Sequence, residues 1–252
     1  MTIQPFISEQ FNGIIWRMEI DEISETLFLE IRNNEERQVS FCAINLLSCE
    51  INFKNLITPE KWLTGIETAY DGVLLLHIYE SSSGPSHKGL VAIDALTGET
   101  LWSTYTYAFD YLSVNGPVVY DSRFQPRKLF LADVKTGGLT RIYEPDVYGL
   151  LKNNVVLPDF VSTDFLSSKL LHLHPFGAGA DYLEYNNFRI VSLHVLKGGQ
   201  LMQALYIFEN NNNLYEDLLT ENIQKIQPES FMMHKNRLIY IKNKTQLKVL
   251  TL

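Results

Sequence analysis

A short segment with the same order of residue types recurs along the chain, and this repeat limits the folds available to it. Its clearest copy covers residues 89–102. There an apolar run ends in Asp94, Thr97-Gly98 follows, and a second apolar run leads to Trp102. Each copy reads as a strand, a tight turn and another strand. The other copies are residues 39–53 with Asn45 and Phe53, residues 128–138 with Asp133, and a looser one at residues 205–215 with Glu209.

The turn in this repeat has a physical basis in two of its residues. The Asp94 carboxylate can accept hydrogen bonds from the backbone N–H groups that follow it, and Gly98 can adopt a positive φ at the end of the turn. Trp102 then begins the outgoing strand as a large packing residue. We therefore expect the same hairpin at each copy.

The remainder of the chain also favours strands. Short runs rich in Val, Ile, Leu, Phe and Tyr recur between Gly, Asn, Asp and Ser residues, which predicts an all-β fold. Residues 214–227, with Leu214 and Leu218, could hold a short helix. The predicted strands outside the repeats include residues 26–31, 73–79, 116–120, 188–196, 238–241 and 247–252.

The segment from Ala92 to Trp102 resembles the blade repeat of quinoprotein-like β-propellers of the pyrroloquinoline-quinone type. The whole chain is also similar to an uncharacterised Bacteroidetes family of such propellers, which implies a bacterial protein and supplies no activity. The resemblance implies that Trp102 packs between neighbouring blades and that Gly98 forms the turn before the outer strand. Quinone-binding members hold the cofactor against a pair of adjacent cysteines. Cys42 and Cys49 are not adjacent, so we expect no cofactor.

The spacing of the repeats predicts five four-stranded blades, with six as the alternative. We expect one propeller domain over residues 1–252, with an insertion or a degenerate blade at residues 145–180, where the Asp turn is missing. We also expect the N- and C-terminal strands to close the ring, with residues 14–19 pairing antiparallel with residues 247–252. Such pairing removes an exposed sheet edge.

The charge balance excludes some partners. The chain has 252 residues with 21 Lys and Arg against 29 Asp and Glu, a net charge of −8. An acidic protein lacks the surplus of cations that binding to phosphate requires, so we expect no nucleic-acid partner and no membrane surface. With no basic leader and no long apolar run, the sequence predicts a cytoplasmic monomer.

Two histidines form a candidate metal site. His172 and His174 lie two residues apart, so on an extended segment both imidazoles point the same way. A metal ion there needs a further ligand, for which Asp164 or Asp181 could serve. The alternative is the polar face of a strand beside a loop.

Four titratable residues occupy matching places in strands that precede the hairpins. Each lies in or beside an apolar run, and burying such a group costs free energy unless it is hydrogen-bonded. One interpretation is that each bonds locally and holds the blades in register. The other is that they face a shared cavity and bind a ligand or metal. The four are Glu30, His77, Asp121 and His194.

These observations predict a non-catalytic binding or interaction protein whose partner is an unidentified protein or small molecule. The sequence has no phosphate-binding loop, no nucleophile elbow and no zinc-protease motif. The alternative is a hydrolase or lyase that acts on a small polar or carbohydrate substrate in an axial pocket, where carboxylates and histidines would supply the chemistry.

Overall fold

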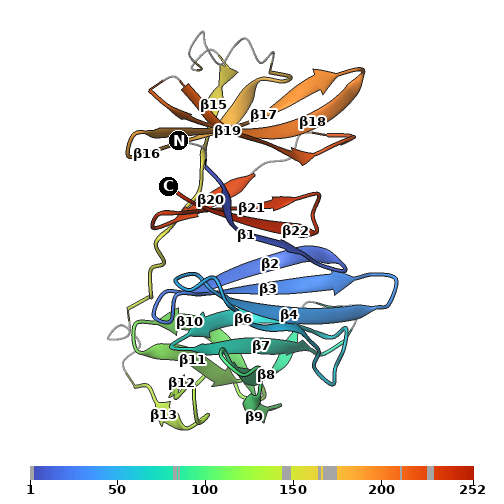
Figure 1. The fold of residues 1–252 in the computed structure, drawn as a ribbon. Helices are drawn as coiled ribbons and strands as arrows, with labels where there is room; N and C mark the ends of the chain where they lie inside the picture. Colours follow the sequence, from blue (N-terminus) through green and yellow to red (C-terminus); the bar gives the residue numbers. More distant parts are fainter. Residues whose placement is uncertain are drawn as a thin grey trace. The chain divides into compact units, whose positions relative to one another are not determined.

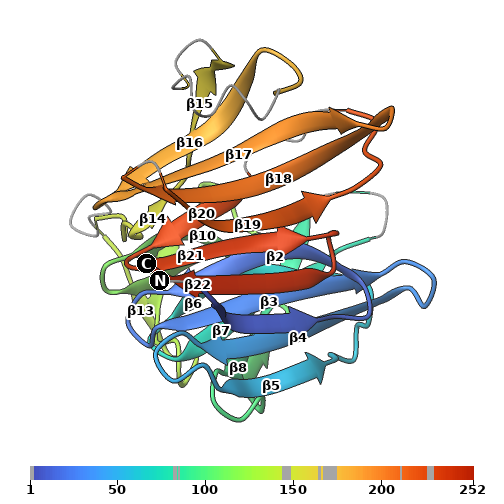
Figure 2. The same ribbon diagram turned by 45° about the horizontal axis from the view of Figure 1, so that its top comes forward.

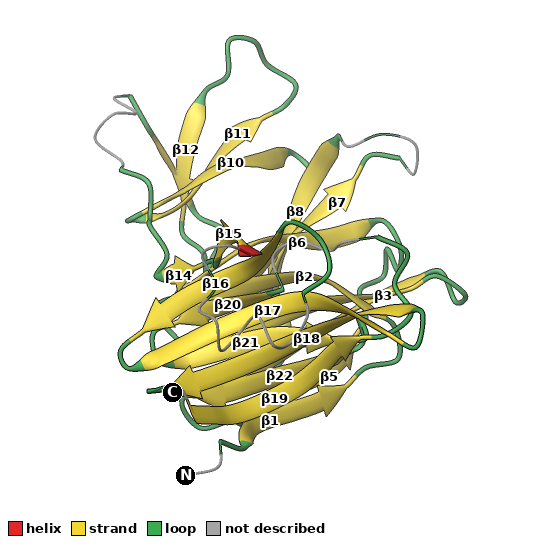
Figure 3. Ribbon diagram, turned by 90° about the horizontal axis from the view of Figure 1, so that it is seen from above, coloured by secondary structure: helices red, strands yellow, loops and turns green. Residues whose placement is uncertain are grey.

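The computed structural model describes residues 3–81, 84, 86–143, 149–163, 166, 175–210, 212–225 and 230–252. These residues form five antiparallel sheets (Figure 3), and none of their named elements is an α-helix, which confirms the predicted all-β class. Contacts divide the chain into two compact units, residues 12–153 and residues 1–11 with 154–252. Whether the chain is one propeller domain stays a prediction. In the described residues no helix has the length and apolarity that crossing a bilayer requires.

The unit of residues 12–153 contains three four-stranded sheets, each with its strands in chain order (Figures 1 and 2). The first consists of β2 (Ile14–Asp21), β3 (Thr26–Asn33), β4 (Gln38–Asn45) and β5 (Ile51–Leu56). The second consists of β6 (Thr64–Tyr70), β7 (Val73–Tyr79), β8 (His87–Asp94) and β9 (Thr100–Thr104). The third consists of β10 (Tyr107–Ser113), β11 (Gly116–Asp121), β12 (Leu129–Ala132) and β13 (Leu139–Arg141).

The middle sheet of this unit is covered on both faces. Leu74 and Leu76 belong to a buried cluster with Phe28 and Phe41 of the first sheet. Val73 and Leu75, which point the other way, pack with residues of the third sheet. This two-sided burial explains why β7 reads as an apolar run that is broken only by His77.

The hairpin turns confirm the predicted repeat in the three sheets of residues 12–153. The fourth copy, at residues 205–215, differs, because Glu209 pairs directly with Asn212 across a shorter connection. The Asp94 carboxylate accepts hydrogen bonds from the N–H groups of Leu96 and Thr97, at 2.9 and 2.8 Å. Gly98 has a φ of +75°. Asn45 and Asp133 accept the same pair of N–H bonds in the first and third sheets.

The aromatic residue of the repeat packs across to the next sheet, as the resemblance implied. A Cβ on Gly137 would lie 2.9 Å from the Trp102 ring, and one on Gly98 would lie 3.3 Å from the Phe53 ring. Trp102 also donates its indole N–H to the Val134 carbonyl at 2.7 Å. The aromatic ring of one sheet thus rests on the turn glycine of the next. A side chain there would crowd the ring, and the positive φ of both glycines also disfavours one.

The second unit contains two five-stranded sheets. One has the order β15 (Asp159–Ser162), β16 (Gly179–Tyr185), β17 (Phe188–Lys197), β18 (Gln200–Glu209) and β19 (Asn212–Thr220). The other has the order β1 (Pro5–Gln10), β22 (Gln246–Thr251), β21 (Arg237–Lys242), β20 (Phe231–His234) and β14 (Val155–Val156). The expected insertion at residues 145–180 thus contributes the short edge strands β14 and β15.

The predicted partner of the C-terminal strand is wrong. β22 pairs with β1, with Ile7 opposite Val249, whereas residues 14–19 lie in β2 and pair with β3 (Figure 1). The β2–β3 hairpin closes a short loop, which costs less entropy than pairing with the far end of the chain.

The possible helix at residues 214–227 is also wrong, because residues 212–220 form β19. β19 pairs with β18 along its length, with two irregularities in register. A spacing of four residues, as between Leu214 and Leu218, fits the period of two of a strand as well as one turn of a helix, so this spacing alone does not distinguish the two structures.

Candidate functional site

The candidate site lies between the first two sheets of residues 12–153, where Glu30 and Arg32 of β3 meet the start of β6. Glu30 is 1% exposed, and its Oε2 accepts a hydrogen bond from the Ile66 N–H at 2.8 Å. Its Oε1 accepts one from the Arg32 side chain at 2.7 Å. Glu30 therefore links two neighbouring sheets, and it also balances the charge of the Arg32 guanidinium.

Gly65 brings two of the predicted site residues to one place. A Cβ on Gly65 would lie 2.8 Å from His77 Nε2 and 3.1 Å from Glu30 Oε2. The imidazole and the carboxylate therefore both pack against the same stretch of β6 backbone. A side chain in place of this glycine would push them away.

Three side chains from adjacent strands converge beside Gly65. Glu67 of β6 is an extra residue in the ladder, because the β6–β7 register shifts between Ile66 and Thr68. Its Oε2 lies 3.2 Å from Nδ1 of His77 on β7 and 2.9 Å from Nδ1 of His87, the first residue of β8. Bulges re-aim side chains, and this one directs a carboxylate at two imidazoles.

The two imidazole rings are stacked. Their centroids are 3.7 Å apart and their planes differ by 7°, while Tyr79 meets both rings edge-on. Burial lowers the pKa of His87, and the adjacent His77 lowers it further, although Glu67 acts in the opposite direction. Both effects favour the neutral imidazole, whose free ring nitrogen can accept a proton or bind a cation.

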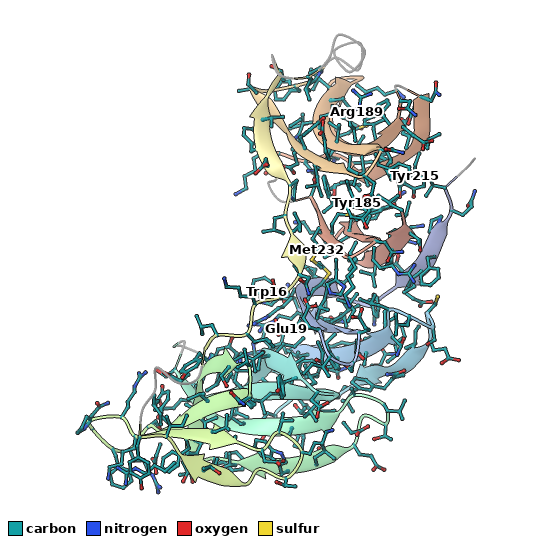
Figure 4. The ribbon with its side chains drawn as sticks, turned by 90° about the vertical axis from the view of Figure 1, so that its left-hand side faces the viewer. Trp16, Glu19, Tyr185, Arg189, Tyr215 and Met232 are labelled. Atoms are coloured by element: carbon teal, nitrogen blue, oxygen red, sulfur yellow. The ribbon has the colours of Figure 1, made fainter. Side chains whose placement is uncertain are left out.

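A pocket adjoins this cluster and shares Tyr79 with it. The Arg32 guanidinium lies over two indoles, 5.0 Å from the Trp16 ring centroid and 5.6 Å from that of Trp62. Trp16 projects from β2 together with Glu19 (Figure 4) and is 65% exposed. The described residues that line the pocket are Arg32, Trp62, Leu63, Tyr79, Ser81 and Gly84.

The other predicted residues lie elsewhere. Asp121 ends β11 of the third sheet and forms a two-point ion pair with Arg123, which lowers the pKa of Asp121. His194 lies buried in β17 of the other unit, where burial lowers its pKa. His172 and His174 lie outside the described residues. A site shared by all four titratable residues of the sequence analysis stays a prediction. These residues are Glu30, His77, Asp121 and His194.

The sequence analysis missed Glu67, His87 and Trp62. Simple alternation does not identify Glu67, because the bulge puts it out of phase with its neighbours. His87 follows a Ser- and Gly-rich loop and reads as part of that loop. The available signal was that His77 lies in the predicted strand of residues 73–79 and that His87 comes just before the repeat copy at residues 89–102. The loop between these two predicted strands could return the second histidine beside the first.

Residues 20–102 of the chain match the sequence model of a family described as "Domain of unknown function (DUF4905)". No curated protein matches. Among solved structures, BamB from Moraxella catarrhalis is 9% identical, with both chains fully covered and a TM-score of 0.35. The β-propeller domain of the Trilobed protease from Pyrococcus furiosus is 12% identical with a TM-score of 0.34, covering 94% of this chain and 65% of that one.

A third similar structure is an oligogalacturonate lyase in complex with manganese. It is 9% identical with a TM-score of 0.32, covering 97% of this chain and 90% of the other. The matched family is a domain of unknown function, and the match covers β3 to β8 with only the end of β2 and the start of β9. The function of this chain must therefore be argued from its own residues.

Proposed function

We propose that this chain is a non-catalytic binding protein that holds a small neutral sugar in the pocket formed by Arg32, Trp62 and Tyr79. The five sheets would be the blades of a quinoprotein-like propeller, closed by the pairing of β1 with β22. The aromatic-to-glycine contact repeated between neighbouring sheets supports this architecture. The protein would act in the cytoplasm as a monomer, without a nucleic-acid or membrane partner.

The pocket beside Arg32 is the observation that carries the ligand class. Trp62 and Tyr79 supply aromatic surface, against which the C–H face of a sugar ring can pack. Arg32 and Ser81 supply hydrogen-bond donors for hydroxyl groups. Since Glu30 already balances the charge of Arg32, the pocket favours a neutral ligand over an anion.

Tryptophan fluorescence provides the test, because Trp62 is one of three tryptophans. The protein is titrated with a panel of neutral monosaccharides, with sugar acids and nucleotides as contrast, and calorimetry measures each affinity. We expect Trp62→Ala to weaken binding of the best sugar at least about tenfold, or 1.4 kcal/mol. The matched control is Tyr143→Ala, which removes an exposed aromatic side chain just after β13. Failure of every sugar to bind, or equal losses in both variants, would contradict the proposal.

A hydrolase or lyase acting on a carbohydrate is the second candidate, and the contact between His87 and Glu67 favours it. The imidazole and carboxylate are hydrogen-bonded at 2.9 Å, an arrangement that general acid–base catalysis uses. This alternative predicts release of new reducing ends from an oligosaccharide panel, with loss of that activity in Glu67→Gln. Binding without turnover would leave the non-catalytic function.

A further inference from the structure

The cluster of Glu67, His77 and His87 has the chemical composition of a metal site. The three residues come from the adjacent strands β6, β7 and β8, and one potential ligand atom from each lies within 4.8 Å of the other two. Two imidazoles with one carboxylate are a ligand set found in zinc sites that retain an open position. Strands of one sheet hold all three, so their spacing does not depend on a loop.

The distances between the ligand atoms suit a tetrahedral ion. Zinc binds imidazole nitrogen and carboxylate oxygen at about 2.0–2.2 Å, which separates neighbouring ligand atoms by about 3.3–3.5 Å. Oε2 of Glu67 lies 3.2 Å from Nδ1 of His77 and 2.9 Å from Nδ1 of His87. Shifts of a few tenths of an ångström would bring these two edges to the expected length.

His77 supplies an independent observation. It is 3% exposed, and neither of its ring nitrogens is hydrogen-bonded to any of the described residues. Nδ1 is near Glu67 but is not aligned with it, so the two atoms are in contact without a hydrogen bond. Leaving a buried polar group without a partner is unfavourable. A cation between the three ligands would satisfy Nδ1.

One rearrangement is required. The rings are stacked, so their Nδ1 lone pairs lie in two nearly parallel planes and do not converge on one point. His77 is held by burial, whereas the side chain of His87 is 30% exposed. His87 therefore turns out of the stack about its Cβ–Cγ bond, and its edge contact with Tyr79 changes with it.

We propose that Glu67, His77 and His87 bind a divalent transition-metal cation, with Zn²⁺ as the best match. Nitrogen ligands select Zn²⁺ and its neighbours over Mg²⁺ and Ca²⁺, which prefer oxygen. Three protein ligands leave a fourth position for water or another small ligand. This metal site is independent of the proposed sugar binding, because experiments with metal ions alone test it.

The test begins with chelator-treated full-length protein titrated with Zn²⁺ in a calorimeter. Co²⁺ serves as a coloured substitute, because tetrahedral Co²⁺ absorbs visible light more strongly than octahedral Co²⁺. We expect one Zn²⁺ per chain, a tetrahedral Co²⁺ spectrum, and a higher melting temperature with Zn²⁺ than with Mg²⁺. Absence of Zn²⁺ binding, or Zn²⁺ binding that is unchanged when the proposed ligand residues are replaced, would overturn the proposal.

Variants then assign the ligands. We expect Glu67→Gln and His87→Ala each to weaken Zn²⁺ binding at least about tenfold. Both residues lie at the edge of the core, so the circular-dichroism spectrum should not change. The control is the double variant His172→Ala/His174→Ala, which removes the other candidate pair and should bind Zn²⁺ as the wild type does. Loss of binding in the control alone, or in only one of the two cluster variants, would refute the three-residue site.

Discussion

At the scale of single residues, the sequence predicted the structure best where a side chain forms hydrogen bonds with backbone groups a few residues away. Asp94 and Asp133 bond the N–H groups two and three residues ahead, so the turn follows from local sequence. The convergence of Glu67 on two histidines depends on a bulge and on three strands, and no local rule contains that information.

The hairpin carboxylates should make the protein acid-labile in a defined way. Hydrogen bonds from Thr136 lower the pKa of Asp133, and a folded-state pKa below the unfolded value near 4 stabilises the protein at higher pH. This contribution is lost as pH falls through the folded-state pKa. We expect Asp133→Asn, which keeps the accepting oxygen, to lose less stability than the wild type between about pH 7 and pH 3.

Urea unfolding at the two pH values measures this difference. Asn45 occupies the same place in the first sheet, so Asn45→Asp is the reciprocal control and should increase the acid sensitivity. If the free energy of unfolding depended on pH in the same way for all three proteins, the aspartate carboxyls of these turns would have the same pKa in the folded and unfolded states, which would contradict the prediction.

Glu30 offers a second test at this scale. Replacing it with Ala leaves the Ile66 N–H and the Arg32 guanidinium without their buried partner. We expect Glu30→Ala to lower the free energy of unfolding by about 3–5 kcal/mol, and Glu30→Gln to lower it less. Denaturant unfolding measures both, and a change below about 1 kcal/mol in Glu30→Ala would contradict the linking role.

At the scale of elements, the hairpins with a marked turn were predictable and the edge strands were not. β14 has two residues and β15 has four, too few for a period to be recognised. β1 has a weak alternation, with Ile7 as its only buried residue. These strands form because a neighbouring edge is available, which is a tertiary effect.

The pairing of β1 with β22 can be tested by truncation. Removing residues 1–11 takes away the ladder along β22 and the buried side chains of Ile7 and Phe11. Each buried apolar side chain contributes about 1.5–3 kcal/mol, so we expect a clearly lower melting temperature. Removal of residues 1–3 alone is the control. Equal melting temperatures for the wild type and the longer deletion would refute this role of β1.

At the scale of the whole molecule, the all-β class followed from one repeated hairpin. Aromatic residues and turn glycines of successive copies meet across sheets, so the same short pattern specifies both the turn and the contact with the next sheet. The division into two compact units could not be foreseen, because it depends on which sheets contact each other.

Circular dichroism checks the fold at this scale. The described residues contain no α-helix, so we expect a β-type spectrum with helix well below the third that is usual for globular proteins. Helix above about a fifth would contradict the structure. A spectrum that changes little on adding Zn²⁺ would agree with a binding site formed within an existing sheet.

The pairing of β1 with β22 also has a consequence for synthesis on the ribosome. β1 emerges well before β22, yet the two are neighbours in one sheet. Until β22 has emerged, β1 therefore lacks its partner, and this sheet cannot be completed. The three sheets of residues 12–153 involve only nearby strands and can form earlier. A nascent chain would thus keep the backbone edge of β1 and its Ile7 side chain available to chaperones until this sheet is assembled.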